Sequence, residues 1–261
     1  MKFSVTIITI NKNNKEGLVK TINSVLTQVD ASFEYVIIDG KSDDGSVEIL
    51  NQYSHKIDFW SSEPDIGIYN AMNKGIDKAN GDYLLFLNSG DIFNDDNSLK
   101  KVLGYLDGTD IIYGDKFIEK EGKLILHYTP PEIDFNFFLV SSLPHPSTFI
   151  KSHLFNKFGK YNENFKIVSD WEFFLKVICI GNVSYKKVDL VISIFNTLGI
   201  SSQAFSTEIN QNERNAVLLK DYRSFLGMMY INKFEKKRFP INLLNRLILK
   251  LYLYLNERNS K

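Results

Sequence analysis

Tyr83-Leu84-Leu85-Phe86-Leu87-Asn88-Ser89-Gly90-Asp91 is the stretch of this 261-residue chain that decides its fold class. The apolar run, bounded by Gly81 and by a Ser/Gly turn, predicts a buried strand over residues 82–87. Asp91 follows at the carboxyl end of that strand, where open α/β sheets bind their ligands. A second carboxylate, Asp39, ends another predicted strand. Two acidic strand ends in an α/β pattern indicate a divalent cation and an anionic ligand that carries a nucleotide.

Strands and helices alternate over the first hundred residues. Strands are predicted at 3–10, 33–38, 57–60 and 82–87, and apolar residues at helical spacing predict helices between them, near 18–29, 46–53 and 68–79. Helices of this length between strands imply right-handed crossovers and a mostly parallel sheet. After residue 108 the pattern predicts short strands at 111–113, 116–118 and 124–128, with Glu121-Gly122 as a hairpin turn. Residues 169–180 are predicted to be helical, 183–185 and 188–195 extended, and the chain from 205 onward helical.

The bulk composition limits the class of protein. The chain is 44% hydrophobic, enough for one large core, and its formal net charge of zero is unevenly distributed. Residues 211–261 hold 11 Lys/Arg against 4 Asp/Glu, which indicates either an anionic partner such as a membrane surface or a solvated helical face. The single cysteine, Cys179, excludes a disulfide framework and a cysteine-based metal site, as expected in a reducing compartment. The N-terminus lacks signal-peptide features, and no apolar run reaches the roughly 18–20 residues that span a bilayer.

Asp39 and Asp91 are the first candidates for chemistry. A carboxylate at Asp39 can accept a hydrogen bond from a base N–H, which uracil, thymine and guanine offer on their pairing edge, or it can simply stabilise a turn. Asp91 is the metal candidate, because Mg²⁺ and Mn²⁺ favour oxygen ligands and Mg²⁺ is often held by one or two carboxylates plus substrate phosphates. Asn88 can bond a ribose hydroxyl or hold the turn.

Three further polar residues stand in loops or on a helix. Asp65, in the loop before the third predicted helix, could touch the nucleotide. Lys74 could neutralise a phosphate, pair with a carboxylate or be merely solvated. His145, stiffened by a proline on each side, could bind phosphate, metal or acceptor, or be structural. The other histidines have no partner pattern and are predicted to be structural: His55, His127 and His153.

Ser169-Asp170-Trp171-Glu172 has two interpretations. Ser-x-x-Glu is a capping box, and acidic residues near a helix N-terminus complement the macrodipole. Alternatively, Asp170 projects outward as a general base while Ser169 and Glu172 cap the helix.

Taken together, six stretches in this order and spacing resemble the inverting glycosyltransferases of family 2, which have the GT-A fold. The stretches are Val5–Thr9, Asp39–Ser46, Glu63–Ile76, Asn88–Asp91, His145–Phe149 and Asp170–Glu172. The resemblance covers roughly residues 1–200 and implies a Rossmann-like α/β domain with a mostly parallel central sheet flanked by helices. It also implies a metal-dependent glycosyltransferase that uses Mn²⁺ or Mg²⁺ and inverts the anomeric carbon.

The resemblance assigns roles by position. Asp91 matches the last Asp of the family's Asp-x-Asp-type motif and would bind the metal, and Asp170 matches the catalytic base. The residues expected around the nucleotide sugar are Thr9, Asn11, Asp39, Lys41, Asp65, Lys74, Asn88, Ser89 and Gly90. The candidates for the acceptor or phosphate side are His145, Trp171 and Glu172.

The chain departs from the family pattern at two places. Asn88 and Gly90 stand where many members have acidic residues, which predicts a weaker metal site or one that depends on donor phosphates. Glu172 follows Asp170 by two positions, whereas many members place an acidic pair together. Glu172 is therefore the alternative base.

The sequence therefore predicts an enzyme of surface polysaccharide biosynthesis that moves a sugar from a nucleoside diphosphate sugar, with UDP-sugar favoured, to a glycan or lipid-linked hydroxyl. We expect a catalytic domain over 1–204, divided into a nucleotide-sugar half (1–108) and an acceptor half (109–204), and a helical, basic extension over 205–261. We expect it in the cytoplasm or peripherally on the cytoplasmic face of the inner membrane. Residues 236–261 would contact the membrane or self-associate, and no nucleic acid partner is expected.

Two alternatives stay open at this point. One is a sugar nucleotidyltransferase, although residues 11–15 lack the Gly-rich phosphate loop which that chemistry usually brings. The other is an inactive nucleotide-sugar-binding or scaffold subunit.

Overall fold

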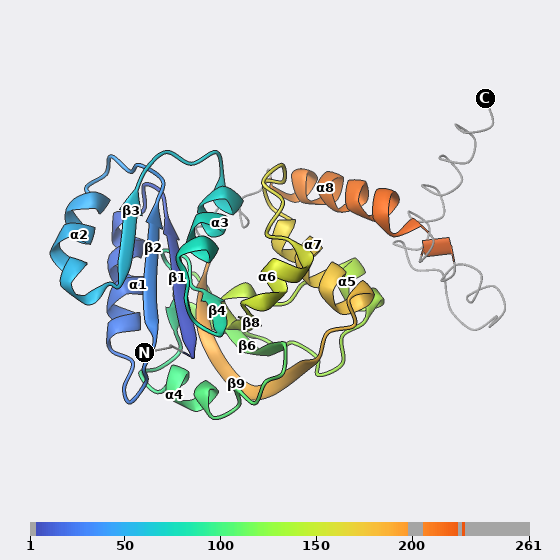
Figure 1. Cartoon of the computed structure of the whole chain (residues 1–261), viewed down its shortest axis with the longest axis horizontal. Coiled ribbons are helices and arrows are strands. Elements are labelled where there is room, and N and C mark those ends of the chain that lie inside the picture. The colour runs from blue at the N-terminus through green and yellow to red at the C-terminus, as the bar shows by residue number, and fades with distance from the viewer. Residues whose placement is uncertain (1–3, 198–205, 224–225, 228–261) are drawn as a thin grey trace. The chain divides into compact units, whose positions relative to one another are not determined.

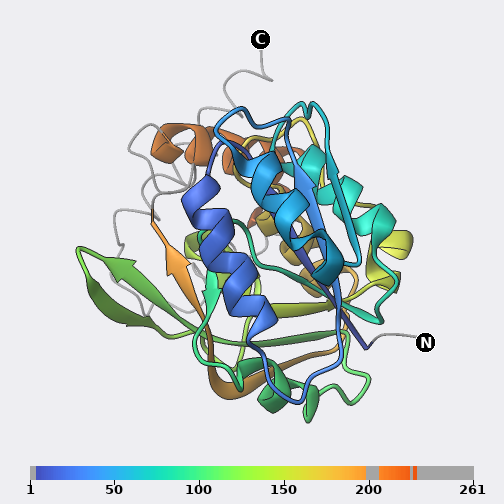
Figure 2. The ribbon, with the colours of Figure 1, turned by 90° about the vertical axis from the view of Figure 1, so that its left-hand side faces the viewer.

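A nine-stranded sheet forms the centre of the unit Met1–Arg214 (Figures 1 and 2). This computed structural model describes residues 4–197, 206–223 and 226–227. The strand order is β3-β2-β1-β4-β8-β6-β9-β5, and β7 pairs with β6 alongside this path. The strands are β1 (Val5–Asn11), β2 (Glu34–Asp39), β3 (Phe59–Ser62), β4 (Tyr83–Phe86), β5 (Ile92–Phe93), β6 (Ile111–Lys120), β7 (Lys123–His127), β8 (Thr148–Lys151) and β9 (Tyr185–Asn196).

Most strands of the sheet run in one direction. β1 pairs in parallel with both β2 and β4, and β2 pairs in parallel with β3. β8 is antiparallel to both β4 and β6, so β6 runs with β4, and β9 is parallel to β6. β5 and β7 run against their neighbours β9 and β6. The predicted mostly parallel sheet is therefore confirmed.

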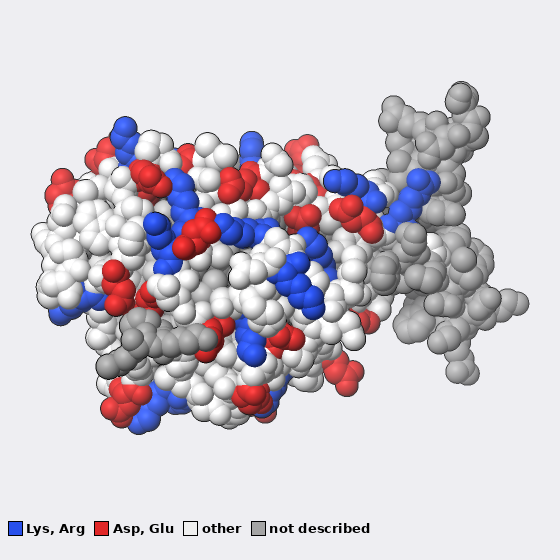
Figure 3. Space-filling view, in the orientation of Figure 1, with Lys and Arg blue, Asp and Glu red and all other residues white. Residues whose placement is uncertain are grey.

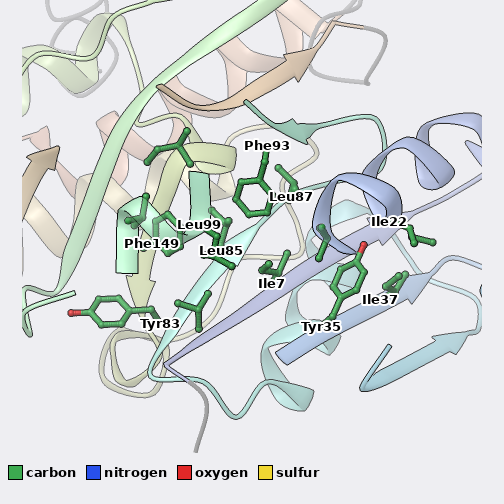
Figure 4. Packing of buried hydrophobic residues seen from close by; sticks show 14 of the residues in the cluster. Ile7, Ile22, Tyr35, Ile37, Tyr83, Leu85, Leu87, Phe93, Leu99 and Phe149 are labelled. Atoms are coloured by element: carbon green, nitrogen blue, oxygen red, sulfur yellow. The ribbon is translucent and has the colours of Figure 1, made fainter. Parts of the chain in front are cut away.

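Helices cover both faces of the parallel half because side chains alternate along each strand. Ile7, Tyr35 and Ile37 point to one face and pack with Ile22 of the first helix (Figure 4). Ile8 points to the other face, toward the third helix. The helices are α1 (Lys15–Leu26), α2 (Ser46–Tyr53), α3 (Ile68–Lys78), α4 (Ser98–Leu103), α5 (Phe135–Val140), α6 (His153–Phe158), α7 (Ser169–Leu175) and α8 (Ser206–Asp221).

The second half of the sheet differs from the prediction in detail. The hairpin turn at Glu121-Gly122 is confirmed, with φ of 53° and 73°, and Figure 2 shows this hairpin reaching beyond the neighbouring strands. The strands predicted at 111–113 and 116–118 are one strand, β6, interrupted by an irregularity in its register with β9 near Asp115. The extended segments predicted at 183–185 and 188–195 are likewise one strand, β9.

The predicted capping box at the start of α7 is wrong. The helix begins at Ser169 itself, with Val168 as the N-cap residue and no side-chain cap hydrogen bond. The Ser169 hydroxyl instead accepts a hydrogen bond from the backbone N–H of Asn162 at 2.5 Å. The serine therefore ties the preceding loop to the helix.

The unit Asn215–Lys261 is described only in part. Within it the structure describes the end of α8, residues 222–223 and residues 226–227, so the predicted basic, apolar segment 236–261 lies outside the described residues. No helix among the described residues is long and apolar enough to cross a membrane. On the face drawn in Figure 3, acidic and basic side chains of the described part are interleaved.

Candidate active site

A cavity of about 740 Å³ opens at the carboxyl ends of β1 and β4. The chain runs from β1 outward to β2 and β3 and then returns to place β4 on the other side of β1, so the strand order reverses here. Such switch points in α/β sheets are where ligands bind, and this volume suits a nucleotide sugar. The predicted site residues on its wall are Asn11, Asp65, Asn88, Ser89, Asp91, His145 and Asp170.

Asp91 ends a tight turn that α1 holds in place. The Thr21 hydroxyl donates to the carbonyl oxygen of Asp91 at 2.8 Å and accepts from the N–H of Gly90 at 2.9 Å. Gly90 adopts a φ of 105°, which favours glycine. One Asp91 carboxylate oxygen accepts the backbone N–H of Asn196 at 2.9 Å, and burial raises the pKa of the side chain to about 7.

His145 lies between Asp91 and the second acidic group, Asp170. Its Nε2 is 3.8 Å from Asp91 Oδ2, and its Nδ1 is 3.8 Å from Asp170 Oδ2. Burial lowers the pKa of His145 to about 4, so the imidazole is neutral near pH 7 and these approaches are not ion pairs. Its Nε2 is also 3.2 Å from the Asn88 side-chain nitrogen. A neutral imidazole beside a carboxylate is suited to hold a metal or to orient Asp170.

Asp170 is placed by α7 and by an aromatic cluster beneath that helix. Phe173 of α7 stacks on Phe155 of α6 with ring centroids 4.6 Å apart, which fixes the helix against α6. The Asp170 side chain is 18% exposed. Its Oδ1 accepts a hydrogen bond from the Tyr69 hydroxyl at 2.8 Å. The carboxylate is therefore accessible from the cavity and held in one orientation.

Asn11, Lys12 and Asp65 form the wall on the side of the first strand. The Asp65 carboxylate accepts from Lys12 Nζ at 3.4 Å and from the N–H of Gly67 at 3.2 Å. The Asn11 side-chain oxygen is buried without a hydrogen-bond partner, although its amide nitrogen donates to Asp39. Unpaired buried acceptors are rare and point to a missing donor. This wall offers polar groups for the base and ribose of a nucleotide.

Asp39 lies beneath this wall and not on it. It is fully buried, and its two oxygens accept four hydrogen bonds, from the side chains of Asn11, Ser42 and Ser62 and from the N–H of Ser42. A carboxylate has about four lone-pair positions, so these bonds engage it fully. In this geometry Asp39 organises the loop after β2, and direct contact with a base stays a prediction.

The remaining predicted site residues lie within the described chain but off the cavity wall. Thr9 is buried and donates to the carbonyl of Leu87, and Lys41 is exposed. Lys74 pairs with Glu63 at 2.9 Å and donates to the carbonyl of Pro64, so it takes the carboxylate-pairing alternative. The other three residues off the wall are Gly90, Trp171 and Glu172.

Trp171 has a structural environment. It is buried, and its indole N–H donates to the carbonyl of Phe138 at 2.8 Å. The Arg214 guanidinium lies over its ring at 4.7 Å from the centroid. The residue thus anchors α7 beneath Asp170.

Sequence reasoning missed several residues on the wall. Tyr69, Lys116 and His127 line the cavity, although His127 was expected to be structural and no role was predicted for Tyr69 or Lys116. Their positions depend on how separate elements meet, which spacing along one chain does not reveal. Only the Tyr69 position could have been found, because it lies in the first turn of the helix that follows Asp65.

Three neighbouring residues fit a divalent metal. The side-chain oxygen of Asn88 is buried without a hydrogen-bond partner, beside Asp91 and the neutral His145. Oxygen and imidazole donors of this kind suit Mn²⁺ or Mg²⁺. No three His, Cys, Asp or Glu side chains of the described residues gather to hold a metal by themselves. The donor set is therefore sparse and suits a metal that a diphosphate also ligates.

The model of the family described as Glycosyl transferase family 2 matches residues 4–167. The chain belongs to glycosyl transferase family 2. This family 2 chain is 32% identical over 204 residues to an uncharacterized glycosyltransferase of Mycobacterium tuberculosis, across 76% of this chain and 77% of the relative. It is 26% identical, with the same coverage, to a PGL/p-HBAD biosynthesis glycosyltransferase of Mycobacterium bovis. The predicted family is confirmed, and the chain is a glycosyltransferase.

Solved structures confirm the predicted GT-A fold of this family 2 chain. Residues 1–349 of Staphylococcus aureus TarS in complex with UDP-GlcNAc match with a TM-score of 0.64 and 18% identity, over 78% of this chain and 64% of that TarS fragment. The mannosyltransferase PcManGT of Pyrobaculum calidifontis, in complex with GDP-Man and Mn²⁺, matches with a TM-score of 0.61 and 13% identity, over 78% of this chain and 60% of PcManGT. This chain thus spans less than two thirds of either solved chain.

Proposed function

We propose that this family 2 glycosyltransferase transfers one sugar from a nucleoside diphosphate sugar, with UDP-sugar favoured, to a hydroxyl of a glycan or lipid-linked acceptor, with inversion. The observation that carries the proposal is that Asp91 and Asp170 line one cavity at the switch point, each 3.8 Å from His145. Support for the donor class comes from TarS and PcManGT, whose complexes contain UDP-GlcNAc and GDP-Man. A relative named as a PGL/p-HBAD biosynthesis glycosyltransferase supports a role in polysaccharide or glycolipid biosynthesis.

Asp170 is the proposed general base. It takes the proton of the acceptor hydroxyl while that oxygen forms a bond to the anomeric carbon. The bond from the anomeric carbon to the diphosphate oxygen breaks, and the nucleoside diphosphate leaves with the electron pair. Because the acceptor attacks the face opposite the leaving group, the configuration inverts. Tyr69 keeps one carboxylate oxygen occupied and thereby orients the other.

Asp91, Asn88 and His145 are the residues proposed to hold a divalent metal. A metal held there would supply Lewis-acid stabilisation of the negative charge that develops on the leaving diphosphate. Lys74, expected from the sequence to share this work, is engaged with Glu63 and Pro64. In this proposal, Asn11, Asp65 and Ser89 bind and orient the donor from one side of the cavity, and His145 does so from the other side.

Replacing Asp170 tests the proposal. Asp170→Asn should abolish sugar transfer, because an amide cannot accept the proton, while UDP binding measured by calorimetry remains. Glu172→Gln is the matched control, because Glu172 lies on the same helix two residues away and off the cavity wall. Near wild-type transfer by Asp170→Asn would remove Asp170 from the role of base, and loss of transfer in Glu172→Gln alone would make Glu172 the base.

A further inference from the structure

Lys116 is a cation on the cavity wall that the mechanism above does not use. It lies on β6, and its ammonium group is 4.1 Å from the centroid of the Phe195 ring. No carboxylate of the described residues forms an ion pair with it, whereas Lys187, on the neighbouring strand β9, pairs with Asp115 at 3.2 Å. A partly buried lysine usually has an anionic partner, so Lys116 is short of one.

His127 lies opposite Lys116 and is also incomplete. The two residues are cross-strand partners in the β6–β7 hairpin, and both line the cavity. The His127 Nδ1 atom is buried without a hydrogen-bond partner. Burial lowers the pKa of His127, and the positive charge of Lys116 lowers it further. A neutral imidazole still donates through one ring nitrogen.

Lys116 lines the same cavity as Asp91 and Asp170. Burial lowers the pKa of Lys116, and the charges of Asp91 and Asp170 raise it. Lys116 in turn lowers the pKa of His145. An anion bound by Lys116 would therefore share the cavity with the proposed metal residues and the proposed base.

We propose that Lys116 and His127 form a phosphate-binding subsite of the cavity. The proposal rests on the proposed function for the source of the phosphate: a diphosphate could belong to the nucleotide donor or to a lipid diphosphate acceptor. A lysine ammonium group is a compact point charge that binds phosphate oxygens, and a buried imidazole N–H adds a directional donor. Lys116 of the β6–β7 hairpin thus supplies the cation for the phosphate, which Lys74 does not supply because it pairs with Glu63.

Binding of three probes to the full chain in EDTA tests the subsite. The probes are UDP, inorganic diphosphate and farnesyl diphosphate, measured by calorimetry. Lys116→Gln should weaken binding of inorganic diphosphate about tenfold or more, because it removes a charge-assisted contact. Lys116→Arg should retain most of the affinity. Lys120→Gln is the matched control, because Lys120 is an exposed lysine on the same strand, away from the cavity.

The pattern across probes identifies the source. Loss of UDP affinity assigns the subsite to the donor, and loss of farnesyl diphosphate affinity alone assigns it to the acceptor. If Lys116→Gln does not fold, His127→Gln carries the test, with an expected weakening of about threefold or more. Wild-type affinity for all three probes in both variants, or no binding of any probe to the wild-type protein, would overturn the subsite. Lys116-dependent diphosphate binding in a wild-type protein that transfers no sugar would instead refute the proposed function alone.

Discussion

The hydrogen bond that orients Asp170 joins two side chains 101 positions apart. Tyr69 comes from the first turn of α3 and Asp170 from the first turn of α7, and both helices lie on the same side of the sheet as Phe86 and Phe155. Tyr69 is buried, so its hydroxyl has little access to water as an alternative partner. A hydrogen bond to a carboxylate in this setting has a large effect on the position of the base.

Tyr69→Phe should therefore reduce kcat by roughly 10- to 100-fold, the equivalent of about 1.5–3 kcal/mol for a hydrogen bond to a charged group. KM for the donor should change little, because the phenol ring remains in place. Steady-state kinetics with saturating acceptor would measure both quantities.

Tyr161→Phe is the control for that substitution. Its ring lies 5.6 Å from the Tyr69 ring, centroid to centroid, but its buried hydroxyl has no hydrogen-bond partner. Removing an unsatisfied hydroxyl should leave kcat near wild type and should not lower stability. Equal losses in the two variants would show that packing, and not the Asp170 contact, explains the effect.

Asp91→Ala should abolish Mn²⁺ binding in the presence of UDP, because Asp91 is the single carboxylate proposed to hold the metal. Electron paramagnetic resonance of free and bound Mn²⁺ would measure this independently of transfer. Asp95→Ala is a suitable comparison: this carboxylate pairs with Lys101 at 2.8 Å, away from the cavity wall. Undiminished Mn²⁺ binding by Asp91→Ala would remove Asp91 from the metal site.

The sequence predicted single residues well where chain order alone places them. Asp91 lies in the turn after β4 and Asn11 ends β1, so the position of both at the sheet edge followed directly. The proposed role of Lys116 and His127 was not predictable from the sequence, because the proposal depends on cross-strand register in a hairpin and on a hydrogen-bond partner that is missing at His127. Lys74 resembled a phosphate ligand, and only the structure reveals its bond to the Pro64 carbonyl.

At the scale of elements, the approach of α3 to the sheet depends on one glycine. A Cβ at Gly75 would lie 2.5 Å from Ile8 Cγ2 and 3.7 Å from Ile38 Cγ1. Ile8 is fully buried and β-branched, so it has little freedom to turn away. α3 carries Tyr69, and the loop before it carries Asp65, so this packing sets the geometry of one cavity wall.

Gly75→Ala should destabilise the protein by about 1–3 kcal/mol through overpacking, although alanine favours helix more than glycine does. Urea unfolding would measure the change. Gly104→Ala is the comparison, because Gly104 has a φ of −67° and a Cβ there would meet its nearest neighbour at 3.5 Å, an ordinary contact. A Gly75→Ala protein as stable as Gly104→Ala would show that α3 can shift without cost.

Elements with strong periodicity were predictable, and short ones were not. The first four strands and the helices between them follow hydrophobic patterns of sufficient length, although β3 lies two residues later than expected, at Phe59–Ser62. α5 and α6 have six residues each, too few for a helical period to emerge. Local pattern also misread Ser169, because a hydroxyl bonded to Asn162 has the same sequence signature as a cap.

At the scale of the whole molecule, the order of motifs was the strongest signal. Each motif alone is common, yet the order of the motifs along the chain indicates the family, whose model matches residues 4–167. The division at residues 108/109 and 204/205 stays a prediction. Charge asymmetry is a whole-chain property of a different kind, since it predicts a partner and not a fold.

The basic, apolar end of the chain leads to the last prediction. We expect residues 236–261 to attach the protein to anionic membranes, because residues 211–261 hold 11 Lys/Arg against 4 Asp/Glu and Arg246 and Lys250 interrupt an apolar run. Each basic residue near an anionic surface contributes about 1 kcal/mol. The full chain should therefore float with phosphatidylglycerol vesicles at low salt and detach at high salt, when the charges are screened. A chain that ends at residue 235 should stay in solution while retaining UDP binding. If both chains fail to float but only the full chain forms dimers in light scattering, the segment serves self-association instead.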